Sequence, residues 1–341
     1  MIQSFEHGSF RPHPRSIGGH RQTFYGYWAR RRLRWERPVQ EQVVRVAEDV
    51  ALLVRGSWQP GPRDASPALL LLHGLEGNDR ATYMLSTGEL AYRLGWHVVR
   101  VNWRGCGGTE QWSRRIYNAG VVEDLKAVLS WLTVEQGVAA LAVVGFSLGG
   151  NLAVLHAGRD ARELPDALRA LVAISAPLDL KACSLALEQR QNRFYQHYFV
   201  FQLRRTYRRR SRLSPELYPP GRERGTVTLR SYDDAVVAPA FGFADAFDYY
   251  ARASAAPHLG AVRIPTLILN AADDPLVPPA SLEQALAGAS DRVQLELTST
   301  GGHCGFVAPS VAPGSFWAAD RALGFCTAAL AAAPAAVRLQ A

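Results

Sequence analysis

Apolar runs and amphipathic segments alternate along most of the chain. A short continuous apolar run bounded by turn-forming residues is typical of a strand that is buried on both faces of a parallel sheet. The segments with this character, which we predict as strands, are 68–74, 96–105, 140–146, 170–180, 265–274 and 293–299. Residues 42–58 indicate two further short strands joined by a turn at Glu48 and Asp49.

Several intervening segments have the spacing of helices that bury one face. The predicted helices are 81–95, 119–132, 148–159 and 315–331. In the second of these, apolar residues recur at helical spacing along one face: Val121, Val122, Leu125, Val128, Leu129 and Leu132. Strands that alternate with helices indicate an α/β protein with a mostly parallel, eight-stranded sheet and helices on both faces.

Two regions depart from this alternation. Residues 1–40 form an N-terminal arm rich in aromatic and basic residues, and residues 181–262 are polar, aromatic and rich in arginine. We expect a core of residues 41–180 and 263–341. Residues 181–262 would then be a helical lid, inserted at the sheet edge where ligands bind in such folds. The alternative is a helical insertion that plays no part in access to that edge.

Composition limits the class of protein. The chain has 341 residues, of which 48% are hydrophobic, enough for a large buried core. Its start lacks the apolar stretch of a secretory signal, and its most apolar segment, 138–155, is interrupted by glycines and polar residues. The cysteines, which lack CxxC spacing, are Cys106, Cys183, Cys304 and Cys326. We therefore expect free thiols, a cytoplasmic location, and neither a metal nor a cofactor.

The net charge of +8 comes almost entirely from arginine. One cluster is Arg30, Arg31, Arg32, Arg34 and Arg37, and the other is Arg204, Arg205, Arg208, Arg209, Arg210 and Arg212. Each cluster fits either a solvated helix face or a surface that contacts an anion such as a lipid headgroup. No nucleic-acid motif accompanies them, so we expect no nucleic-acid partner, while contact with a membrane surface stays open.

The segment GFSLG, residues 145–149, fits the pattern G-x-S-x-G between a predicted strand and a predicted helix. In that context the serine sits on a sharp, strained turn, and its neighbours two residues away must be small to allow close packing. We predict Ser147 as a nucleophile. The alternative is a small residue in a buried junction between strand and helix.

A nucleophilic serine needs a base and an acid that orients the base, here in the order Ser, Asp, His beyond later strand ends. His303 lies in the glycine-rich segment that follows the last predicted strand, and we predict it as the base. Asp273 and Asp274 both end the strand before it. Asp274 has the usual spacing to a small apolar residue and proline, so we predict it as the acid and expect Asp273 to hydrogen-bond the turn.

The tetrahedral intermediate needs two backbone N–H donors. One is expected from Leu148, which follows the serine, and the other from Leu75 in the segment HGLEG, residues 73–77. His73 in that segment is expected to be structural and packed beneath the turn.

Six motifs together resemble one known family. They are HGLEGN (73–78), NWRGCGG (102–108), GFSLGGN (145–151), SAPLDL (175–180), NAADDP (270–275) and GGHCGF (301–306). The sequence is similar to the YheT-like, ABHD1/2/3-type branch of the α/β-hydrolases, and residues 19–23 resemble that branch's N-terminal H-x-Q-T element. The resemblance implies the α/β-hydrolase fold and a serine hydrolase that acts on carboxylic esters, with acyl-ester exchange in some relatives. It implies the same triad of Ser147, Asp274 and His303.

We therefore predict a serine esterase that forms an acyl-enzyme with small-molecule, short- to medium-chain or lipid-like esters. Aromatic residues of the insertion would line an apolar pocket or pack within the insertion itself: Phe194, Tyr195, Tyr198, Phe199, Phe201 and Tyr207. The alternatives are an acyltransferase or thioesterase with the same triad, or a non-catalytic binding protein on a hydrolase scaffold.

Overall fold

The structure, a computed structural model, describes residues 10–29, 33–309 and 316–332. One eight-stranded sheet runs through it in the order β1-β2-β4-β3-β5-β6-β7-β8. The strands are β1 (Gln40–Ala47), β2 (Val50–Ser57), β3 (Ala68–Leu72), β4 (His97–Asn102), β5 (Leu141–Phe146), β6 (Leu168–Ile174), β7 (Thr266–Ala271) and β8 (Val293–Thr298). β2 is antiparallel to both of its neighbours, and the remaining strand pairs are parallel. The predicted α/β class and mostly parallel sheet are confirmed.

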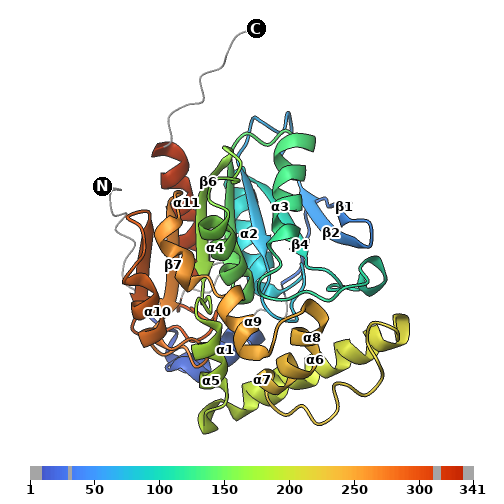
Figure 1. The fold of residues 1–341 in the computed structure, drawn as a ribbon. Coiled ribbons are helices and arrows are strands. Elements are labelled where there is room, and N and C mark those ends of the chain that lie inside the picture. Colours follow the sequence, from blue (N-terminus) through green and yellow to red (C-terminus); the bar gives the residue numbers. More distant parts are fainter. Residues whose placement is uncertain (1–9, 30–32, 310–315, 333–341) are drawn as a thin grey trace.

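Helices cover both faces of this sheet (Figure 1). α2 (Thr82–Arg93) and α11 (Trp317–Ala332) pack on one face, and α3 (Val122–Ser130), α4 (Leu148–Arg159) and α10 (Pro279–Leu286) pack on the other. Successive leucines of β3 point to opposite faces of the sheet. Leu69 and Leu71 therefore pack on the face covered by α2 and α11, and Leu70 and Leu72 pack on the face covered by α3, α4 and α10. A strand buried on both sides must be apolar at every position, which is why these strands read as continuous apolar runs.

The structure corrects three expectations. The strand predicted at 170–180 ends at Ile174, because Ser175 turns the chain with a φ of 51°. α10 was not expected between the last two strands. α1 (Gly19–Ala29) lies in the arm, whose sequence shows little periodicity. In contrast, the six apolar residues predicted on the face of 119–132 are all buried, although the helix continues into a π-helical turn, η3 (Trp131–Glu135).

Residues 181–262 are mostly helical and lie together at the lower end of the sheet in Figure 1. Their elements are α5 (Leu180–Leu187), η4 (Arg190–Asn192), α6 (Arg193–Leu213), α7 (Leu229–Tyr232), η5 (Asp233–Val237), α8 (Ala238–Phe241), α9 (Ala246–Ala253) and η6 (Ala256–Ala261). They form a separate apolar cluster that includes Leu203, Tyr207, Tyr232, Tyr249 and Tyr250. Two further short helices, η1 (Pro14–Ser16) and η2 (Glu110–Trp112), lie outside this region.

Candidate active site

Ser147 occupies the sharp turn between β5 and α4, with φ of 50° and ψ of −121°. This positive φ is a strained conformation for a residue other than glycine. The turn also explains both glycines of the motif. A Cβ on Gly145 would lie 2.5 Å from the Gly149 carbonyl oxygen, and a Cβ on Gly149 would lie 2.6 Å from the His73 carbonyl oxygen. The sequence therefore needs small residues here so that Ser147 can project from the end of the strand.

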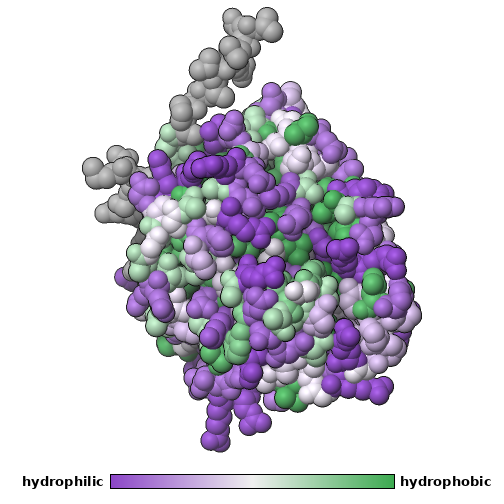
Figure 2. Space-filling model, in the orientation of Figure 1, coloured by the Kyte–Doolittle hydropathy of each residue, from purple (hydrophilic) through white to green (hydrophobic). Residues whose placement is uncertain are grey.

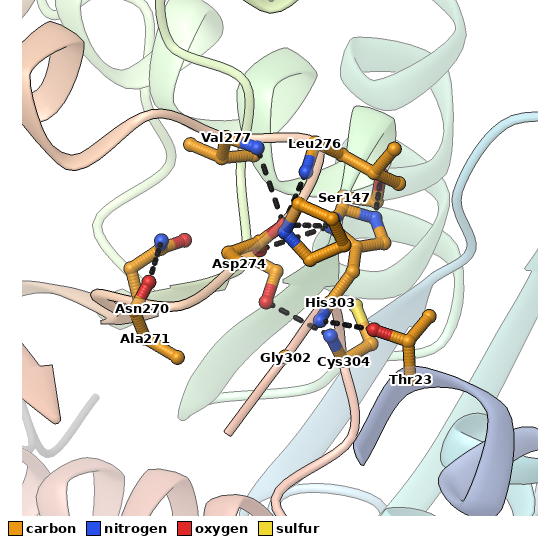
Figure 3. A network of polar contacts seen from close by, with 12 residues as sticks. Thr23, Ser147, Asn270, Ala271, Asp274, Leu276, Val277, Gly302, His303 and Cys304 are labelled. Atoms are coloured by element: carbon orange, nitrogen blue, oxygen red, sulfur yellow. Dashed lines mark hydrogen bonds and ion pairs between the residues drawn. The ribbon is translucent and has the colours of Figure 1, made fainter. Parts of the chain in front are cut away.

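The structure brings Ser147, His303 and Asp274 together (Figure 3). His303 Nε2 lies 2.9 Å from Ser147 Oγ, and His303 Nδ1 lies 3.0 Å from Asp274 Oδ2. With Nδ1–H donated to the carboxylate, Nε2 is free to accept the serine proton. This arrangement has the geometry of a nucleophile, a base and an orienting acid.

The two adjacent aspartates point to different partners. Asp274 Oδ1 also accepts hydrogen bonds from the backbone N–H groups of Leu276 (2.8 Å) and Val277 (3.1 Å), so the buried carboxylate is fixed facing His303. Asp273 instead accepts from the hydroxyl of Thr300 and from the amides of Gly301 and Gly302, at 2.6, 2.9 and 2.9 Å. Asp273 therefore holds the turn before His303, as expected, and does not contact the histidine ring.

The N-terminal arm supports the histidine from the other side. The His303 amide donates to Thr23 Oγ1 at 2.9 Å, and the Thr23 hydroxyl donates to the Gly19 carbonyl at 2.8 Å. Gly302 lies so close to α1 that a Cβ on it would stand 2.3 Å from the Gly19 oxygen. Sequence reasoning did not assign Thr23 a role, although residues 19–23 had been singled out by resemblance.

Leu148 directly follows Ser147, and both Leu75 and Leu148 line the pocket that contains Ser147. Among the described residues neither amide donates to a protein acceptor, so both are available to an oxyanion. The neighbouring amides are occupied, because Gly74 N–H donates to Tyr83 Oη at 3.1 Å and Glu76 N–H donates to Tyr117 Oη at 2.7 Å. These two tyrosines hold the turn that carries the Leu75 amide.

His73 is fully buried beneath this turn. Its Nδ1 bonds the Gly74 carbonyl at 2.8 Å, and its Nε2 accepts from Trp103 N–H at 3.2 Å. Burial lowers the His73 pKa to about 4, so the ring is neutral. Its contacts are those of the structural residue that we expected.

The pocket that contains Ser147 and His303 has a cavity volume of about 120 Å³ and a mostly apolar wall. Its apolar lining includes Ile116, Leu180, Leu187, Leu203, Leu229 and Val237. Of the six aromatic residues expected either to line the pocket or to pack within the insertion, only Phe199 lines it. Tyr195 and Tyr207 are buried elsewhere, and Phe194, Tyr198 and Phe201 are exposed. The aromatic wall is made instead by Tyr232, Tyr249 and Tyr250, which follow the arginine-rich helix in sequence.

Glu76 joins the insertion to the turn beside Ser147. Its Oε2 accepts from Thr206 Oγ1 of α6 at 2.5 Å, and Tyr117 Oη donates to its Oε1 at 3.4 Å. Burial raises the pKa of the Glu76 carboxyl above its usual value. Because Leu75 is the adjacent residue, α6 contacts the segment that carries one predicted oxyanion donor.

Several arginines of the two clusters form hydrogen bonds and ion pairs within the protein. Arg210 is buried and donates to the Glu110 and Ser113 carbonyls, and Arg208 and Arg209 pair with Glu223 and Glu110. In the first cluster Arg30, Arg31 and Arg32 lie outside the described residues. Hydrophilic residues predominate on the face shown in Figure 2, with hydrophobic residues in small groups. No helix in the described parts of the chain is long and apolar enough to cross a membrane.

Among the described residues the four cysteines form no disulfide bond, and burial raises the pKa of the Cys106, Cys183 and Cys326 thiols. Raised thiol pKa values are those of packing residues and not of nucleophiles. Cys304 directly follows His303, and its backbone amide donates to Ser175 Oγ at 3.0 Å.

Comparison with known proteins identifies the family of the chain. A family model described as alpha/beta hydrolase fold matches residues 67–308. The chain is 35% identical over 269 residues to YheT of Escherichia coli (strain K12), which is named as an esterase, and the alignment covers 78% of each chain. It is 31% identical over 247 residues to phospholipase ABHD3 of Homo sapiens, covering 72% of this chain but only 60% of that protein's length.

Among solved structures, 2,6-dihydroxy-pseudo-oxynicotine hydrolase matches with a TM-score of 0.60 at 19% identity, covering 93% of this chain and 75% of that chain. At this identity the likeness shows the fold alone. The family model spans most of the chain, and the alignment with YheT extends over most of both proteins. The chain therefore belongs to the α/β-hydrolase fold family, and within it to the YheT-like branch.

Proposed function

We propose that this carboxylic ester hydrolase cleaves short- to medium-chain acyl esters through Ser147, His303 and Asp274. The observation that supports the proposal most strongly is the continuous hydrogen-bonded path from Asp274 through His303 to Ser147 in an apolar pocket. A binding protein on the same scaffold would have no need of a base within hydrogen-bonding distance of a strained serine.

In the proposed reaction, His303 Nε2 takes the proton from Ser147 as Oγ attacks the ester carbonyl. Asp274 keeps the imidazole in the correct tautomer and stabilises the imidazolium. The amides of Leu75 and Leu148 donate to the carbonyl oxygen as it becomes negative. His303 then protonates the departing alcohol, which leaves an acyl group on Ser147. Water, deprotonated by the same histidine, releases the acid and restores the serine.

The dimensions of the pocket support the chain-length range. An apolar protein cavity of about 150 Å³ binds benzene, so a cavity of this size holds a group of a few carbons without displacing its walls. The pocket here has a cavity volume of about 120 Å³. Because one relative is named as a phospholipase, lipid-like esters belong to the proposed substrate class, with the chain length set by this pocket.

A panel of nitrophenyl esters from acetate to palmitate tests the proposal. We expect kcat/KM to be greatest among the short- and medium-chain esters, and Ser147→Ala to remove the activity. Highest activity on palmitate would contradict the chain-length range, and full activity in Ser147→Ala would contradict the nucleophile. Ethanol added to the same assay separates the alternative acyltransferase, which would form ethyl esters in preference to free acid.

A further inference from the structure

Among the described residues, the carboxyl groups of Glu76 and Asp233 both line the mostly apolar pocket that contains Ser147. Asp233 begins the π-helical turn η5 in the insertion and lines the same cavity as Ser147 and His303. The residue is only 6% exposed. π-Helical turns are rare and are frequent at functional sites.

Only one of the two carboxyl oxygens of Asp233 has a protein partner. Tyr250 Oη donates to Oδ2 at 2.6 Å, and Tyr250 in turn accepts from Ser184 Oγ at 3.2 Å. Among the described residues Oδ1 has no hydrogen-bonding partner and Asp233 has no ion pair. Because Asp233 lines the cavity, a ligand that supplied a hydrogen-bonding partner to Oδ1 would be favoured over one that placed an alkyl group against it.

The other polar groups around this part of the pocket are already engaged. Tyr232 Oη donates to the Leu203 carbonyl, and Tyr249 Oη accepts from Ala119 N–H. Glu76 accepts from Thr206, and Arg104 forms a buried pair with Asp124. Arg210 donates to carbonyls outside the pocket. The neighbouring Asp234 accepts from the Ala246 amide.

Burial raises the pKa of Asp233 to about 7. The carboxyl therefore spends much of its time protonated near neutral pH, when it can both accept and donate a hydrogen bond. A neutral hydroxyl satisfies either state and, unlike an ammonium group, does not bring a second charge into an apolar cavity.

We infer that Asp233 determines specificity by binding a hydroxyl group on the chain of the ester that enters the pocket. This inference rests on the proposed function, because it takes Ser147 to open esters bound in this cavity. The preferred substrate class is then a hydroxylated acyl ester and not a plain alkanoate. An ester with a methyl group in place of the hydroxyl would leave Oδ1 unpaired. The site should therefore select against that ester, as polar sites do against apolar analogues of their substrates.

Matched esters test the inference in the wild-type protein. Nitrophenyl 3-hydroxybutanoate, 6-hydroxyhexanoate and 8-hydroxyoctanoate are compared with 3-methylbutanoate, heptanoate and nonanoate, in which methyl replaces hydroxyl. An apolar pocket prefers the alkyl ester of every pair, because burying an unpaired hydroxyl is unfavourable. We expect the hydroxylated ester to have the equal or higher kcat/KM in at least one pair. Preference for the alkyl ester in all three pairs would overturn the inference.

Variants then connect the preference to the residue. In Asp233→Leu the ratio of hydroxylated to alkyl kcat/KM should fall about fivefold or more for the preferred pair, the effect of leaving one buried polar group unpaired. Asp233→Asn, which keeps the shape and a hydrogen-bonding group, should retain most of the preference. A smaller fall in Asp233→Leu would overturn the assignment to Asp233.

Labelling of Ser147 by a fluorophosphonate probe separates this inference from the proposed function. If wild type labels and hydrolyses the alkyl esters without the hydroxyl preference, the inference alone fails. If wild type neither labels nor hydrolyses any ester, the proposed function fails with it.

Discussion

The residues beside the scissile bond and the residues that enclose the pocket come from two differently built regions. Ser147, Asp274 and His303 follow strands of the sheet. Ser147 and Asp274 are fixed by neighbouring backbone, through a strained turn and two amides, and the His303 amide donates to the hydroxyl of the arm residue Thr23. The opposite wall, with Tyr232, Asp233, Tyr249 and Tyr250, lies in the insertion and is fixed by contacts between distant side chains. Under the proposed function, the core would supply the chemistry and the insertion would select the substrate.

The largest expected effect is a difference in kcat between substitutions of the adjacent core residues Asp274 and Asp273. Asp274→Asn leaves His303 in the wrong tautomer, and we expect kcat to fall about ten-thousand-fold, as for the orienting acid of other triads. Asp273→Asn weakens only the turn, and we expect kcat to fall less than about a hundredfold, with a loss of about 1–3 kcal/mol in unfolding free energy. Steady-state kinetics with one nitrophenyl ester and denaturant unfolding measure both. Equal losses of kcat would contradict the assignment of Asp274.

His73 in the core and Asp233 in the insertion should respond to pH in opposite directions. His73 in the core has its pKa lowered to about 4, below the unfolded value of about 6.5, so its contribution to stability is lost as pH falls from about 6.5 to 4. Asp233 in the insertion has its pKa raised to about 7, above the unfolded value of about 3.9, so its contribution is lost as pH rises from about 4 to 7. Each effect is about 3–4 kcal/mol at about 1.4 kcal/mol per pKa unit.

Unfolding free energies of His73→Gln and Asp233→Asn, measured against wild type from pH 4 to 8, test this contrast. As pH falls, the unfolding free energy of His73→Gln should rise relative to that of wild type. As pH rises, the unfolding free energy of Asp233→Asn should rise relative to that of wild type. Two differences that change in the same direction would contradict the opposite pKa shifts of His73 and Asp233.

The smallest effect should come from the contact that joins the two regions. Thr206→Val removes the hydrogen bond from α6 to Glu76, beside the Leu75 amide. We expect kcat to fall about two- to tenfold, the value of one hydrogen bond, with KM for short esters nearly unchanged. Thr300→Val, which removes a bond to Asp273 instead, is the matched control for loss of a threonine hydroxyl. A change confined to KM would show that Thr206 acts on binding and not on the oxyanion turn.

The sequence predicted the core well because its information is local. Continuous apolar runs located the strands, and the spacing from Asp274 to the following proline distinguished it from Asp273. The prediction was weaker where distant contacts decide the structure. The strand at 170–180 was drawn too long because the apolar residues after Ser175 continue past the turn.

The pocket wall could not be predicted for the same reason. Tyr249 Oη bonds the Ala119 amide and Tyr218 Oη bonds the Ile116 amide, contacts that span 130 and 102 residues. No motif in the sequence marks these tyrosines. The aromatic residues considered as pocket lining lie close to the arginine cluster in sequence, and most of them lie outside the pocket. α1 was missed because the arm has no apolar stripe, although it contacts the His303 segment through Thr23.

The most direct test of the account is the site of modification by a fluorophosphonate probe. The protein is labelled in the presence and in the absence of a short-chain ester and is then digested. The modified peptide is identified by mass spectrometry. The account predicts one adduct on Ser147, slowed by the ester, reduced in His303→Ala and absent in Ser147→Ala. An adduct on another residue, or equal labelling of Ser147 in wild type and His303→Ala, would contradict it.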